Sequence, residues 1–188
     1  MSDDRPRDPG RSTQWLAAFT LIAFVATLVT GYAVNALSGR LRDDTGQSLV
    51  KLEFAGWSYS SDKVLRAWDE RGLLPTAIRA QKVDFFFAMS YGALALAAAL
   101  LVWRARRGSR TGRVLAGLVA LGAVAALCDE VENLRMWAIL HGRGAADHVL
   151  PSMAAALKFA LIAVAGVSAA LALLLKRSTP ADTSRPPS

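Results

Sequence analysis

The chain has a single cysteine, Cys128, among its 188 residues. One thiol cannot form an internal disulfide, and it also excludes a paired-thiol redox centre and a zinc site built from several cysteines. The P-loop, GxGxxG, HExxH and GxSxG patterns are absent too, so the sequence lacks the common signatures of nucleotide-binding enzymes, zinc proteases and serine hydrolases. These absences remove several large classes of enzyme and leave other activities open.

Charge is scarce as well. Charged residues make up 20% of the chain and hydrophobic residues 53%, whereas a soluble domain carries about 25% charged residues. The formal net charge is +7, but the basic residues lie beside apolar runs, which favours contact with anionic lipid. We therefore expect a lipid bilayer, and no nucleic acid, as the partner of this chain.

Four apolar runs are long enough to cross a bilayer, which takes about 20 residues per helix. They lie at about residues 15–37, 85–103, 114–140 and 153–175. Backbone groups in lipid must bond within their own segment, so the runs predict an all-α, polytopic four-helix bundle over residues 15–175. The first run could also serve as a signal peptide with Val34-Asn35-Ala36 as its cleavage site, but it is longer than the ~7–15 residues of a signal core. The tails, 1–14 and 176–188, are rich in Pro, Ser, Asp and Arg, and we expect them to be disordered.

Basic residues set the expected orientation. The segment between the second and third runs, RARRGSRTGR (104–113), has arginine as its only charged residue type, and Lys176 and Arg177 follow the fourth run. By the positive-inside rule, both termini are cytoplasmic in a bacterial inner membrane, and the loop 38–84 faces outward. Within that loop, a capping sequence at 60–62 and an apolar face of Val64, Leu65 and Trp68 predict an amphipathic helix.

A polar cluster interrupts the third run, in the sequence CDEVENL (128–134). Asp129, Glu132 and Asn133 are spaced i, i+3, i+4, so they share one helix face, and Glu130 points elsewhere. Asp129 lies roughly 20 Å along the helix from the start of the run, at ~1.5 Å per residue. In a hydrocarbon core about 30 Å thick, that depth is still inside the membrane.

Three further chargeable side chains, Asp84, Lys158 and Glu53 of the outer loop, are expected at a similar level, and Tyr91 is expected deeper. Asp84 opens the second run, Tyr91 lies on the same face seven residues later, and Lys158 lies near the outer end of the fourth run. Glu53, in the loop sequence LEFAG, is a possible contributor. A charged residue facing lipid costs about 2.5–3.5 kcal/mol, so we expect these side chains to converge with the 129–133 cluster inside the bundle, in an outward-facing polar pocket.

The sequence alone is compatible with three roles for this pocket. Its hydrogen bonds could serve only to fix helix packing. It could bind a lipid, a small amphiphile or a partner subunit, and the chain could also form a homo-oligomer. It could also belong to a membrane enzyme or a proton- or cation-coupled carrier, with Asp129 or Glu132 as the acid–base group and Lys158 beside it. One lysine cannot neutralise several interior acids, so a proton, water, Arg135 or a cation must supply the balance.

The two histidines of the chain, His141 and His148, both fall in the loop between the third and fourth runs. No spaced carboxylate motif accompanies them, so we read them as surface residues and expect no metal site. The sequence indicates no particular cofactor.

The sequences DFFFAMSYG (84–92) and CDEVENL (128–134), together with the lysine of AAALKFAL (154–161), carry a resemblance. The chain resembles an uncharacterised family of small bacterial four-span integral membrane proteins, over roughly residues 15–175. The outer-loop LEFAG followed by an amphipathic helix fits this family too. The resemblance implies four spans and an extracytoplasmic amphipathic helix, and it brings no established activity.

Overall fold

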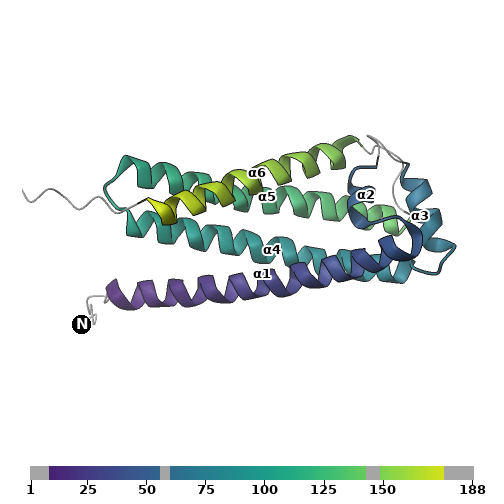
Figure 1. The fold of residues 1–188 in the computed structure, drawn as a ribbon, viewed down its shortest axis with the longest axis horizontal. Helices are drawn as coiled ribbons and strands as arrows, with labels where there is room; N and C mark the ends of the chain where they lie inside the picture. The colour runs from purple at the N-terminus through teal and green to yellow at the C-terminus, as the bar shows by residue number, and fades with distance from the viewer. Residues whose placement is uncertain (1–8, 56–59, 143–148, 176–188) are drawn as a thin grey trace, which may run out of the picture.

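The computed structural model describes residues 9–55, 60–142 and 149–175. These ranges fold into helices and their connections without a strand, so the predicted all-α class is confirmed. The helices are α1 (Pro9–Thr45), α2 (Leu49–Glu53), α3 (Ser61–Asp69), α4 (Leu74–Ala105), α5 (Arg110–Leu140) and α6 (Val149–Leu174) (Figure 1).

Helices α1, α4, α5 and α6 are each long and apolar enough to cross a membrane, so the chain is a multi-pass membrane protein. All four extend beyond the apolar runs at one end or both. Helix α1 begins at Pro9, so the expectation of a disordered tail as far as residue 14 is wrong for residues 9–14. Proline favours the first turn of a helix, and no helix-breaking residue separates this turn from the apolar run. Residues 1–8 and 176–188 lie outside the described part of the chain.

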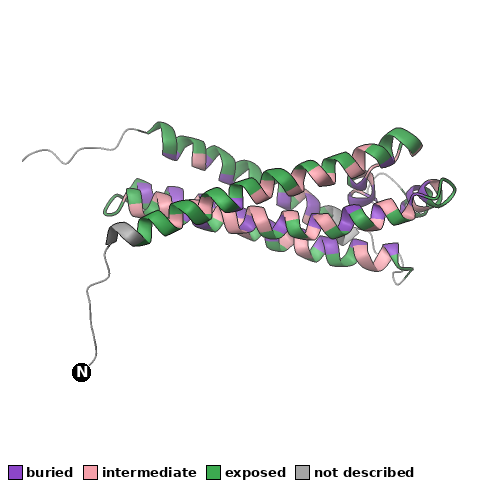
Figure 2. Cartoon of the chain, turned by 90° about the horizontal axis from the view of Figure 1, so that it is seen from below, coloured by how far each residue is buried: buried purple, intermediate pink, exposed green. Residues whose placement is uncertain are grey.

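The four long helices lie side by side along the longest axis of the molecule (Figure 1). Helices α4 and α5 form the central pair and make the most extensive contacts, while α1 packs on α4 and α6 packs on α5. Figure 2 shows exposed residues along much of the outer faces of these helices, as expected where lipid is the solvent. Helix α1 is the most exposed of the four, because α4 is its main helical neighbour.

Small residues allow α4 and α5 to approach closely. A Cβ atom placed on Gly92 of α4 would come within 2.7 Å of the Cβ of Ala126, and one on Gly122 of α5 would come within 2.7 Å of the Cβ of Ala95. Real side chains do not tolerate such distances, so both glycines are required for this spacing. Close packing of small residues is the usual way in which membrane helices associate, since lipid removes the hydrophobic drive between them.

The short helices α2 and α3 cover one end of the bundle (Figure 1). Helix α3 begins after Ser60, as the capping sequence predicts, and the chain turns at Gly72, where a φ of 65° favours glycine. Val64 and Trp68 are buried in an apolar core, where Trp68 also donates a hydrogen bond to the Gln47 carbonyl at 3.1 Å. The predicted amphipathic helix is thus present, and its apolar face packs on the protein.

The opposite end carries the arginines of the α4–α5 connection. Helix α1 begins at this end and α6 finishes there (Figure 1). We call it the arginine end, after its five members Arg104, Arg106, Arg107, Arg110 and Arg113. The two ends therefore differ in chemistry: one is capped by folded chain, and the other is basic.

Candidate functional site

Lys158 of α6 reaches three carboxylates near the α2–α3 end of the bundle. Its Nζ lies 2.8 Å from Asp129 Oδ1, 3.0 Å from Glu132 Oε2 and 3.5 Å from Glu53 Oε2. We call these four residues the Lys158 cluster. Lys158 is 4% exposed and Glu132 0% exposed, so the ion pairs lie inside the protein.

Helix periodicity explains how α5 presents its acids. Asp129, Glu132 and Asn133 are all buried, as their shared face predicts, whereas Glu130 is only partly buried. Asp129 and Glu132 both reach Lys158 on the neighbouring helix α6. The predicted pairing of Lys158 with these two acids is present.

Helix α4 contributes a hydroxyl and a fourth acid. The Tyr91 hydroxyl donates a hydrogen bond to Asp129 Oδ2 at 3.0 Å, so the two Asp129 oxygens bind two different helices. Asp84 is buried on the same face of α4, and its charge interacts with those of Asp129 and Glu53. The predicted convergence of α4, α5 and α6 is therefore seen for Tyr91 and Asp84 as well.

Asn133 does not bind the lysine but pairs with a residue that the sequence analysis missed. Gln81 Nε2 donates a hydrogen bond to Asn133 Oδ1 at 2.6 Å, and both side chains are buried. A signal for Gln81 was present, because it precedes Asp84 by three residues and so lies on the same helix face. Gln81 lies before the apolar run of α4, where a polar side chain is not unusual.

Glu53 enters the cluster from outside the membrane-spanning helices. It is the last residue of α2, whose Leu49 and Leu52 are anchored in the apolar core. Burial raises the pKa of Glu53 above its usual value of 4.5, and the nearby charge of Lys158 opposes this shift without cancelling it. The possible contributor from the outer loop is thus within ion-pair distance of Lys158.

The buried charges do not balance among these residues. Four acids (Glu53, Asp84, Asp129 and Glu132) share the interior with Lys158. Arg135 is exposed, so it does not supply the missing positive charge. Among the described residues, buried Gln81 Oε1, Asn133 Nδ2 and Glu132 Oε1 also have no hydrogen-bond partner. Unpaired buried polar atoms are costly, so this interior has unused capacity for protons or for a hydrogen-bonding ligand.

A shallow apolar cavity of about 550 Å³ lies near the cluster, on the seam between α5 and α6, and opens to the outside of the bundle, where most of its lining side chains are exposed. Its walls include Cys128 and Leu157, the immediate chain neighbours of Asp129 and Lys158. The remaining lining is aliphatic, formed by Val124, Leu127, Val131, Met153 and Ala154. A polar interior and an apolar cavity therefore share the same two helices.

The histidines do not join the cluster in the part that the structure describes. His141 Nδ1 lies 2.8 Å from the Trp137 carbonyl oxygen at the end of α5, and His148 falls outside the described residues. Over the described ranges, no three His, Cys, Asp or Glu side chains are arranged to hold a metal ion.

The chain is thus a multi-pass membrane protein with a buried, ion-paired Lys158 cluster. No protein-family model matches it, and no curated protein or solved structure does so either. The resemblance to small bacterial four-span proteins therefore stays a proposal.

Proposed function

We propose that this protein binds a lipid or small amphiphile through the Lys158 cluster and its neighbouring residues. Its setting would be the bacterial inner membrane, with both termini cytoplasmic and the cluster toward the outer side. The observation that carries the proposal is the excess of buried acids and unpaired polar atoms beside an apolar cavity. A ligand with a polar head and an apolar body matches both halves of this arrangement.

Each part of the site has a role in this proposal. Asp84, Asp129 and Glu132 accept hydrogen bonds from a cationic or hydroxylated headgroup, which offsets the surplus of negative charge. Lys158 holds any anionic part of the headgroup. The apolar body of the ligand lies in the cavity between α5 and α6. Glu53 on α2 controls access, because α2 covers this end of the bundle.

Native mass spectrometry of the detergent-purified protein tests this proposal. The wild type is expected to carry a discrete additional mass, and the Asp129→Asn/Glu132→Gln variant to lose it while remaining folded. The matched control is Glu130→Gln, which makes the same kind of change on the same helix but off the buried face. The control is expected to keep the adduct.

Two outcomes would contradict the proposal. An adduct that persists in the double variant would place the ligand elsewhere. Loss of folded protein in the double variant, with no adduct on the wild type, would leave the cluster a purely structural role in helix packing.

The second candidate is a proton- or cation-coupled carrier, or a membrane enzyme that uses Asp129 or Glu132 as its acid–base group. The specific observation in its favour is that Lys158 contacts three carboxylates in a buried site with a fourth nearby. With several carboxylates around one lysine, one of them can take up a proton while another stays paired with Lys158. Proton flux into liposomes is the test: flux lost in Glu132→Gln and kept in Glu130→Gln supports this candidate, and equal flux in both contradicts it.

A further inference from the structure

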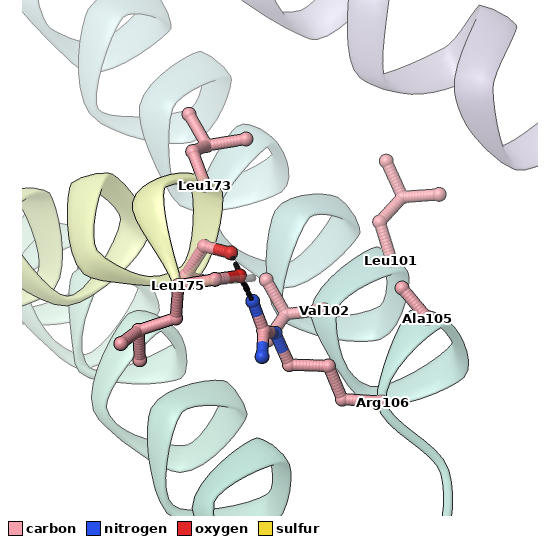
Figure 3. A pocket seen from close by; sticks show the side chains of 7 residues that line it. Leu101, Val102, Ala105, Arg106, Leu173 and Leu175 are labelled. Carbon is pink, nitrogen blue, oxygen red and sulfur yellow. Dashed lines mark hydrogen bonds between the residues drawn. The ribbon is translucent and has the colours of Figure 1, made fainter. Parts of the chain in front are cut away.

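A second cavity lies at the arginine end, far from the Lys158 cluster. It has a volume of about 270 Å³ and lies between the end of α4 and the end of α6 (Figure 3). Its walls are the aliphatic side chains of Leu101, Val102, Ala105, Ala172, Leu173 and Leu175, and Arg106 is its one charged residue. Asp129 lies roughly 28 Å further along α5 from Arg110, at ~1.5 Å per residue, so this cavity is separate from the proposed headgroup site.

Arg106 is held in place at this cavity by α6. Its Nη2 donates hydrogen bonds to the carbonyl oxygens of Ala172 at 2.7 Å and Leu175 at 2.5 Å (Figure 3). The Ala172 carbonyl belongs to the last turn of α6 and the Leu175 carbonyl directly follows the helix, where backbone acceptors lack helical partners and favour a cation. Both hydrogen bonds use Nη2, so among the described contacts the donors on Nε and Nη1 are not engaged.

The surroundings of Arg106 are basic and interfacial. Every charged residue of segment 104–113 is an arginine. The guanidinium of Arg107 lies 4.9 Å from the ring centre of Trp103, which is 43% exposed. Tryptophan and arginine side chains at the end of a spanning helix are typical of the headgroup level of a membrane.

We propose that this cavity binds an anionic phospholipid. The phosphate would accept hydrogen bonds from the remaining donors of Arg106, and the neighbouring arginines would add favourable charge. An acyl chain would lie along the aliphatic walls formed by α4 and α6. Charge complementarity selects an anionic lipid over a zwitterionic one, because no acid in segment 104–113 is available for a cationic headgroup. This site does not depend on the proposed function of the Lys158 cluster.

The first experiment measures lipid retention by native mass spectrometry after incubation with equal amounts of phosphatidylglycerol and phosphatidylcholine. The wild type is expected to retain phosphatidylglycerol in preference. Arg106→Gln is compared with Arg113→Gln, which removes the same charge at the same end outside the cavity. Both variants lose the same general attraction of one arginine for anionic lipid, so it cancels in the comparison. A further loss of about fivefold in Arg106→Gln relative to Arg113→Gln is expected from the charge-assisted hydrogen bonds of a specific contact.

A second variant keeps the test valid if Arg106→Gln does not fold. Ala105→Trp fills the cavity from its exposed wall and leaves Arg106 in place. This variant is expected to lose the preference for phosphatidylglycerol while it elutes as a folded protein. Retention equal to that of the wild type would overturn the proposal, as would equal losses in Arg106→Gln and Arg113→Gln.

Inorganic phosphate distinguishes a lipid from a free anion. Phosphatidylglycerol is expected to raise the thermal unfolding midpoint of the wild type, and inorganic phosphate at the same concentration is expected to leave it unchanged. An equal rise with inorganic phosphate would overturn the assignment to a lipid, because the aliphatic walls would then contribute nothing.

Discussion

At the scale of single residues, Lys158 decides the stability of the buried cluster. Its removal would leave Asp129 and Glu132 without their cation in a site closed to water. Breaking a buried ion pair from one side costs ~3–5 kcal/mol, because the remaining charge is left uncompensated. We therefore expect Lys158→Met to lower the free energy of unfolding by about this amount, as measured by thermal or denaturant unfolding in detergent.

Two comparisons test this expectation. The exposed Lys63→Met on α3 is expected to leave stability unchanged, because its side chain faces solvent. Adding Asp129→Asn and Glu132→Gln to Lys158→Met is expected to recover part of the loss, since the acids are then neutral. If Lys158→Met proves as stable as Lys63→Met, the ion pairs do not support the fold.

The raised pKa of Glu53 predicts that the stability of the protein depends on pH. Because burial raises its pKa in the folded protein, the folded state binds the proton more tightly than the unfolded state. Its contribution to stability is therefore complete below the usual pKa of 4.5 and is lost as the pH rises through the higher pKa of the folded state. Glu53→Gln cannot titrate, so the thermal midpoint of the wild type should fall relative to this variant as the pH rises above about 4.5. A difference that does not change with pH would contradict the role of burial.

The sequence predicted Asp129, Glu132 and Lys158 together, with Glu53 as a possible contributor, but it did not predict Gln81 as the partner of Asn133. Asp129, Glu132 and Lys158 stand out because ionised groups are rare within apolar runs. Gln81 is uncharged and lies before the apolar run of α4, so neither hydropathy nor charge marks it. The place of Glu53 depends on how the outer loop folds back onto the bundle, which no local pattern encodes.

At the scale of helices, the close contact between α4 and α5 depends on two glycines. A methyl group on Gly92 or Gly122 would lie 2.7 Å from a neighbouring Cβ atom, so the helices would have to move apart. Overpacking of this kind costs ~1–3 kcal/mol. We expect Gly92→Ala and Gly122→Ala each to lower the thermal midpoint of the purified protein.

Gly117 provides the matched control on α5. A Cβ atom there meets nothing within 4 Å, so Gly117→Ala is expected to be neutral or slightly stabilising, through the better helix propensity of alanine. Equal effects at Gly117 and Gly122 would show that helix propensity, and not helix spacing, determines the result.

The four spans could be predicted because the bilayer imposes a minimum apolar length on every crossing helix. The exact ends of these helices could not be predicted in this way, because a helix can extend beyond the hydrocarbon core for as long as its backbone hydrogen bonds continue. Helix α1, for example, runs on to Thr45, well past the end of its apolar run. The sequence also does not show which helices pack against one another. Small residues indicate helix faces suited to close packing, but they do not identify the helix that packs on each face.

At the scale of the whole molecule, the chain is asymmetric along its long axis. Helices α2 and α3 cover the end nearest the Lys158 cluster, and the arginines gather at the other end (Figure 1). Basic segments are retained on the cytoplasmic side, so this asymmetry predicts one orientation. The capped end and its cluster would then face outward.

Single cysteines test that orientation, because the only native thiol, Cys128, can be removed by Cys128→Ala. Glu70→Cys reports on the end with α2 and α3, and Arg107→Cys reports on the arginine end; both positions are exposed. A membrane-impermeant maleimide added to intact spheroplasts is expected to label the cysteine at position 70 and to reach position 107 only after permeabilisation. The reverse pattern would place the Lys158 cluster toward the cytoplasm, and any ligand would then enter from inside the cell. Labelling of both positions in intact spheroplasts would place both on the outer side, so that no helix or an even number of helices crosses the membrane between them, against the single crossing by α4.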